Sequence, residues 1–121
     1  MRFLGFDASA LLRDPEHAQI GTVRVRTAPV GVTALPDGKH VVVANSNRIA
    51  VNPILPQTLS VIDIDRVRGG AAAIVGTIAA GAFPREFSLS ADRQTLFLGN
   101  YLSDTLQAMD LARLSTLLTR Q

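Results

Sequence analysis

Cysteine is absent from this sequence of 121 residues, and histidine occurs only twice. Without cysteine the chain can form neither disulfide bonds nor thiolate metal sites, and it has no cysteine nucleophile. His17 and His40 have no second histidine or cysteine at ligand spacing, so the sequence predicts no metal site. Lys39 is the only lysine, and it directly precedes His40 in a turn where an exposed histidine is expected.

Aromatic residues and excess charge are also scarce, with five Phe, one Tyr and a net charge of +2. The arginines are scattered along the chain among acidic residues. A nucleic-acid-binding domain needs basic residues gathered on one face and aromatic rings that stack on bases. The composition therefore predicts no nucleic-acid partner.

Long hydrophobic runs are missing as well. The most apolar window, residues 71–83, is too short to span a bilayer and contains two glycines. Residues 1–7 carry too short an apolar run for a signal peptide. No Gly-rich phosphate loop and no nucleophile-elbow serine are found, and we predict no membrane span and no cofactor.

The chain does contain an internal repeat. Residues 21–45 align without a gap on residues 76–100, and the pairs that coincide are Gly21/Gly76, Thr22/Thr77, Pro29/Pro84, Asp37/Asp92 and Asn45/Asn100. Apolar positions between them also match, and residues 59–63 match 106–110 after an insertion in the first copy. A repeat of 40 to 50 residues built from short strands is typical of stacked units such as propeller blades.

Each repeat reads as short strands joined by tight turns. Residues 86–90 alternate polar and apolar, which predicts a strand with one buried face. Residues 95–99 form a dense apolar run, which predicts a strand buried on both faces. The turn at residues 36–39, Pro-Asp-Gly-Lys, predicts a positive φ at Gly38 and an equivalent conformation at Arg93. The recurring Asp37, Asp92, Asp63 and Asp110, and Asn45 and Asn100, are interpreted as side chains that satisfy backbone groups.

These motifs resemble a known family. Pro84, Asp92 and Asn100, with the strands at 87–90 and 96–98 and the segment 103–110, resemble the YVTN-type β-propeller repeat of lactonase-like propeller proteins. Residues 29–38, 41–45 and 59–63 match the same repeat, with Leu35 where the family usually has Ser. The resemblance implies a propeller and a periplasmic or extracellular location, although this chain shows no signal peptide.

The expected fold is all-β: a partial propeller of about two and a half four-stranded antiparallel blades. We assign residues 1–28 to the last strands of one blade, 29–83 to a complete blade with a loop insertion at 46–58, and 84–110 to three strands of a final blade. Residues 111–121 form a tail that is either a short helix or a frayed terminus. The open ends indicate the C-terminal part of a larger ring, whose partners are the missing blades or further copies of the chain.

The candidate ligand site lies where the two repeats differ on one face of the ring. Arg85 and Glu86 stand where the first copy has Val30 and Gly31. The tentative site combines them with Asn100 and Tyr101 and with Arg48 from the inserted loop. A solvated ion pair at the rim and a tolerated loop insertion are the structural alternatives.

The function predicted from the sequence is a scaffold that binds a small molecule or a protein, without chemistry of its own. The alternative is a lactonase-like hydrolase that acts on a sugar lactone, which needs Arg, Glu and His groups at one mouth of the channel. A redox propeller with haem or quinone is a third class, against which the missing cysteines count in this chain.

Overall fold

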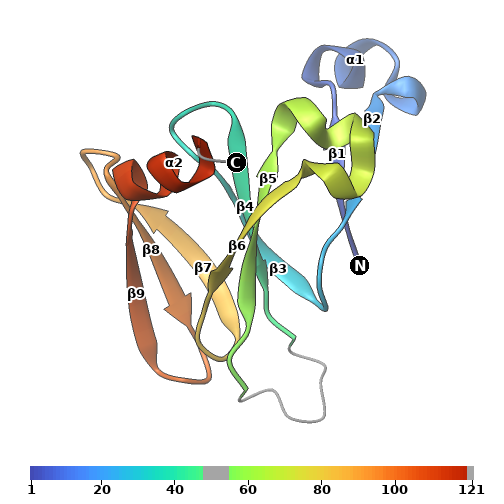
Figure 1. The fold of residues 1–121 in the computed structure, drawn as a ribbon. Helices are drawn as coiled ribbons and strands as arrows, with labels where there is room; N and C mark the ends of the chain where they lie inside the picture. Colours follow the sequence, from blue (N-terminus) through green and yellow to red (C-terminus); the bar gives the residue numbers. More distant parts are fainter. Residues whose placement is uncertain (48–54, 120–121) are drawn as a thin grey trace.

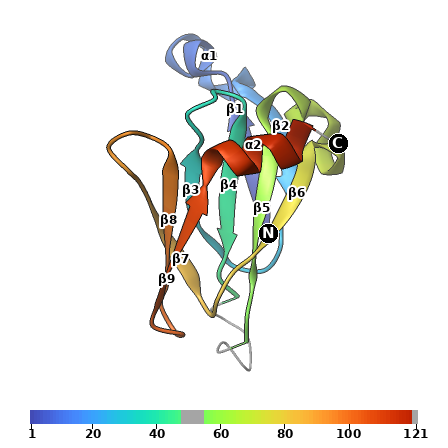
Figure 2. The same cartoon turned by 60° about the vertical axis from the view of Figure 1, so that its left-hand side comes forward.

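The computed structural model describes residues 1–47 and 55–119, which form three antiparallel sheets side by side (Figures 1 and 2). The first sheet pairs β1 (Arg2–Phe6) with β2 (Gln19–Arg24). The second has the order β3 (Pro29–Ala34), β4 (His40–Asn45), β5 (Thr58–Asp63) and β6 (Ile74–Ala79). The third contains β7 (Pro84–Leu89), β8 (Thr95–Asn100) and β9 (Thr105–Asp110). The predicted all-β partial propeller is confirmed.

The hairpins that open the second and third sheets follow the same design. Gly38 and Arg93 sit at equivalent turn positions with φ of 70° and 60°, as the repeat predicts. Asp37 accepts hydrogen bonds from the amides of Lys39 and His40, at 2.8 and 3.1 Å. Asp92 accepts one from the amide of Gln94 at 3.0 Å. Both aspartates therefore fix their turns through side-chain to backbone bonds.

Strand β8 is less buried than its apolar sequence predicts. Leu96 and Leu98 are fully buried, but Phe97 between them is only partly buried, so one face of the strand is open. In β4, by contrast, the residues from Val41 to Asn45 are buried on both faces. The difference arises because β4 lies between two other sheets, whereas no sheet among the described residues covers the second face of β8.

Four helical segments connect or end the strands. They are α1 (Ala8–Arg13), η1 (Pro15–His17), η2 (Ile64–Ala73) and α2 (Leu111–Thr119). Of the two alternatives for the C-terminal tail, the structure shows the helix, and Asp110 caps it by accepting from the amide of Ala112 at 3.0 Å. The first three were not predicted from the sequence. In α1 the cap is Asp7, whose carboxylate accepts from the amide of Ala10 at 2.9 Å.

The core consists of two apolar clusters, one on each face of the second sheet. The first joins the second and third sheets and contains Leu35, Val42, Ala44, Leu59, Val61, Ala80, Leu96, Leu98 and Leu111. The second joins the first and second sheets and contains Val23, Val25, Val41, Val43, Ile62, Val67 and Ala73. Alternate residues of β4 thus belong to different clusters, which places this strand at the centre of the molecule.

Candidate functional site

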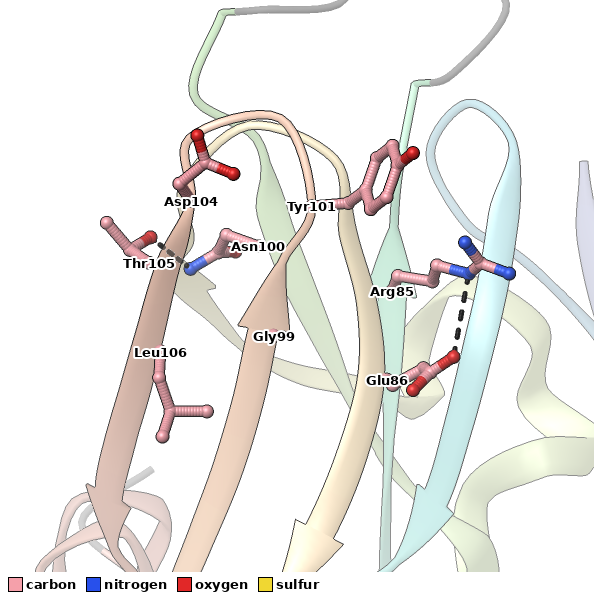
Figure 3. Close-up of a pocket in the computed structure, with 8 residues that line it drawn as sticks. All are labelled: Arg85, Glu86, Gly99, Asn100, Tyr101, Asp104, Thr105 and Leu106. Carbon is pink, nitrogen blue, oxygen red and sulfur yellow. Dashed lines mark hydrogen bonds and ion pairs between the residues drawn. The ribbon is translucent and has the colours of Figure 1, made fainter.

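Strand β7 places Arg85 and Glu86 at one end of the third sheet. Pro84 pairs with Asn100 and Glu86 pairs with Gly99, so Arg85 is an extra residue in a β-bulge. A bulge changes the direction of a side chain at the end of a strand. The two charged side chains lie next to each other, with Arg85 Nε 3.6 Å from Glu86 Oε1 (Figure 3). They are 53% and 78% exposed, so the pair is solvated and available to a ligand.

Tyr101 stands beside Arg85 at the same opening. The guanidinium carbon of Arg85 lies 5.7 Å from the centre of the Tyr101 ring, a cation–π contact. Phe83 also packs edge to face against the Tyr101 ring, with the ring centres 5.5 Å apart. Tyr101 remains 61% exposed. The result is an aromatic surface that a neighbouring ring and cation hold in place.

Asn100 is buried, and all of its observed bonds are structural. Its Oδ1 accepts from the amide of Gly81 at 3.1 Å, while its Nδ2 donates to Thr105 Oγ1 at 3.2 Å and to Gln107 Oε1 at 3.1 Å. The side chain thereby ties the loop after β8 to the segment that enters β7. Asn100 holds the wall of the opening, in agreement with its interpretation from the sequence.

The equivalent Asn45 makes fewer bonds. Its Nδ2 donates to Ser60 Oγ at 3.0 Å and to Thr58 Oγ1 at 3.5 Å, whereas its buried Oδ1 has no hydrogen-bond partner among the described residues. The two repeats therefore share the residue type and its burial but not the full set of bonds.

The opening itself is an open cavity of about 550 Å³. Its lining residues are Arg85, Glu86, Gly99, Asn100, Tyr101, Asp104, Thr105 and Leu106 (Figure 3). Four of the five residues predicted for the site thus share one cavity, and Arg48 lies outside the described residues. The other lining residues were not predicted from the sequence: Gly99, Asp104, Thr105 and Leu106.

The cavity combines a few groups that can bind polar ligands. Arg85 offers a guanidinium fork, Glu86 and Asp104 offer carboxylate oxygens, and Tyr101 offers an aromatic face. Neither His17 nor His40 is among the described residues that line the cavity. Over the described residues there is also no group of three His, Asp or Glu side chains that could hold a metal ion.

The two histidines lie elsewhere. His40 begins β4, at the opposite end of the strand from Asn45, and about five residues of strand separate the two by roughly 16 Å. Its side chain is only 15% exposed, whereas the sequence suggested an exposed histidine. The ring Nδ1 lies 2.6 Å from Asp37 Oδ2, and this bond draws the ring onto the turn. His17 pairs in the same way with Asp14 at 2.9 Å and is well exposed.

Comparison with known proteins places the chain in a family. The family model of the lactonase, seven-bladed β-propeller, matches residues 14–121. The chain belongs to this family. Among solved structures, the hydrazine synthase of Kuenenia stuttgartiensis is similar, with a TM-score of 0.53 and 20% sequence identity. At that identity the likeness shows the fold alone.

The coverage of these matches is uneven. The similarity to hydrazine synthase covers 75% of this chain and 23% of the length of that chain. No curated protein matches this sequence. None of the helices in the described ranges is long and apolar enough to cross a membrane.

Proposed function

We propose that this member of the lactonase propeller family is a binding scaffold of the YVTN-repeat type, with its ligand site at the cavity beside β7. The observation that carries the proposal is the placement of Arg85, Glu86 and Tyr101 around one opening. The equivalent positions of the first repeat have Val30 and Gly31 instead of the ion pair. Charged groups that occur in only one copy of a repeat are not needed by its fold, which favours a role in binding.

The ligand that fits these groups is a small carboxylate or a polyhydroxylated compound. An Arg guanidinium beside a carboxylate offers a preoriented fork for carboxylate or hydroxyl oxygens. Glu86 and Asp104 can accept hydrogen bonds from hydroxyl groups, while the Tyr101 ring can cover an apolar ring face. An aldonate such as gluconate has both kinds of group and serves as a probe.

Calorimetric titration of the full chain with gluconate tests this proposal. We expect Arg85→Ala and Tyr101→Ala each to weaken binding by about tenfold, which corresponds to about 1.4 kcal/mol. Arg113→Ala, in α2 and away from the cavity, is the matched control and should bind as the unmodified chain does. If the Arg85→Ala variant and the unmodified chain bound gluconate with equal affinity, the cavity would not be the binding site.

Hydrolysis of a sugar lactone is the second candidate, and membership of the lactonase family favours it. In this cavity Glu86 or Asp104 would activate a water molecule, while Arg85 would stabilise the oxyanion that forms at the lactone carbonyl. Acid release from glucono-δ-lactone, followed at constant pH, separates the two functions. Turnover that Glu86→Gln or Asp104→Asn abolishes supports the hydrolase. Gluconate binding without turnover by this chain supports the scaffold.

The location of the protein belongs to the same proposal. A periplasmic or extracellular site rests on the resemblance to YVTN propellers, and detection of the native protein in cell fractions tests it. Its recovery with cytoplasmic marker proteins would contradict the assignment.

A further inference from the structure

The loops at one end of the second and third sheets share a backbone but differ in their side chains. Ala28 and Ser46 of the first repeat are equivalent to Phe83 and Tyr101 of the second. The amide of Ser46 donates to the carbonyl oxygen of Ala28 at 3.1 Å, and the amide of Tyr101 donates to that of Phe83 at 2.9 Å. Ala28 and Ser46 are buried, whereas Phe83 is partly buried and Tyr101 is exposed. The same backbone therefore carries two small buried residues in the first copy and two aromatic rings in the second.

Phe83 adopts a backbone conformation that disfavours its bulky side chain. Its φ is 54° and that of the equivalent Ala28 is 51°, so the loop imposes the left-handed conformation in both copies. A bulky residue is uncommon in this region, and strain of this kind is often retained at binding sites. The alanine of the first copy fits the same loop, so the fold does not require an aromatic ring here. A role of the Phe83 ring in binding accounts for its presence.

Val30 and Arg85 occupy equivalent places on two neighbouring strands. Each is the extra residue of a β-bulge near the start of the first strand of its sheet, Val30 in β3 and Arg85 in β7. The two strands lie against each other where Gly31 faces the carbonyl oxygen of Arg85. The side chains of Arg85 and Glu86 extend from β7 toward β3 (Figure 3). In a propeller the first strands of successive blades surround the central channel, so both bulges stand at its mouth.

A second cavity lies between these two strands. It has a volume of about 440 Å³, and the described residues that line it are Val30, Phe83, Arg85 and Glu86. Arg85 and Glu86 also line the cavity that contains Tyr101, so the ion pair borders both cavities. The side chain of Val30 is exposed there. Two apolar side chains, from two sheets that this chain itself supplies, thus adjoin the polar groups of the proposed site.

We propose that the ligand of this site is amphiphilic, with a polar head beside Tyr101 and an apolar chain in the second cavity. The inference rests on the proposed function, because Arg85 holds the carboxylate or hydroxyl groups of the head. The chain of the ligand packs against Val30 and Phe83 and removes their apolar surface from water. Val30 and Phe83 then determine specificity, since they select ligands that carry such a chain.

Methyl and hexyl β-D-glucuronide test this inference, because they share a head with a carboxylate and hydroxyl groups and differ only in the alkyl chain. We expect the full chain to bind the hexyl compound about tenfold more tightly in calorimetric titrations, at concentrations where neither compound forms micelles. In Phe83→Ala the ratio of the two affinities should fall below about threefold. This variant carries the alanine that the first repeat has at the same φ, so we expect it to fold.

Val30→Asn should reduce the same ratio from the other wall of the cavity. Val32→Asn is its matched control, because Val32 is also an exposed valine of β3 but does not line this cavity, and it should keep the tenfold preference. Equal affinity of the unmodified chain for both glucuronides would overturn this inference and leave the proposed function intact. A preference that both Phe83→Ala and Val30→Asn retain would also overturn it. Failure of both glucuronides and of gluconate to bind would overturn the proposed function as well.

Discussion

Gly38 and Arg93 hold the same left-handed backbone conformation at equivalent turns, but only glycine adopts it without strain. A Cβ built on Gly38 meets no atom within 4 Å, so a substitution there is resisted by the backbone conformation alone. We expect Gly38→Val to lower the free energy of unfolding by about 1–2 kcal/mol, measured in urea. Gly38→Asn should cost less, because asparagine tolerates this region. Equal losses for the two variants would contradict this explanation.

The ionisation of Asp37 makes the stability of this turn depend on pH. Burial raises the pKa of the Asp37 carboxyl, but hydrogen bonds from the His40 ring and from the amides of Lys39 and His40 outweigh it and lower the pKa below its ordinary value of 3.8. The ionised carboxylate therefore stabilises the fold above the pKa of the unfolded chain. That contribution is lost as the pH falls through the lower pKa of the folded chain.

Acid denaturation checks this prediction. Between about pH 4 and pH 2, the thermal midpoint of the unmodified chain should fall more steeply than that of Asp37→Asn, which keeps a side-chain acceptor but cannot ionise. Asp92→Asn provides a second case, because a hydrogen bond from the Ser90 hydroxyl, followed by one from the Gln94 amide, lowers the pKa of Asp92. If the thermal midpoints of Asp37→Asn and the unmodified chain fell in parallel with pH, the ionisation of Asp37 would not contribute to stability.

At the scale of elements, β3 and β7 lie so close together at Gly31 that no side chain larger than a hydrogen atom fits between them. A Cβ on Gly31 would overlap the backbone carbonyl oxygen of Arg85, whereas a Cβ on Gly99 in β8 would meet nothing within 4 Å. We expect Gly31→Ala to destabilise the chain by about 1–3 kcal/mol, because the backbones of two sheets must separate. Gly99→Ala is the matched control and should change stability by less than about 0.5 kcal/mol in the same denaturation assay. A similar small effect for Gly31→Ala would show that the sheets separate at little cost.

The strands and helices also show which parts of the structure could be predicted from the sequence. Strand periodicity and the duplicated turns were sufficient for the fold, because the same pattern appears twice at one spacing and each copy supports the other. Helix α1 was missed, since a six-residue helix between two strands offers no periodicity, and only its capping Asp7 marks it. In the candidate cavity, Arg85 and Glu86 were predicted because they differ from the equivalent Val30 and Gly31 of the first repeat. Asp104, in the turn before β9, and Leu106, on β9, were missed because whether a side chain lines a cavity depends on tertiary packing.

At the scale of the whole molecule, β4 joins all three sheets. Val42 packs in the cluster shared with β8, and Val43 packs in the cluster shared with the first sheet. Val42→Ala should lower the free energy of unfolding by about 2 kcal/mol through lost apolar burial. Because both clusters share this strand, hydrogen exchange should report reduced protection in β2 as well as in β8. Reduced protection confined to β8 would mean that the sheets open independently.

The contact between Gly31 and Arg85 has a final consequence for how the binding cavity can vary. The spacing between the two strands is set by the missing side chain of Gly31 and by a main-chain oxygen that every residue type possesses. The side chain at position 85 does not take part in that contact, and it stands on a bulge with half of its surface in solvent. The side chains of β7 are thus free to bind a ligand, whereas Gly31 of β3 sets the spacing between the two sheets. A library that randomises positions 85 and 86 while retaining Gly31 can therefore be selected for new ligands on an unchanged framework.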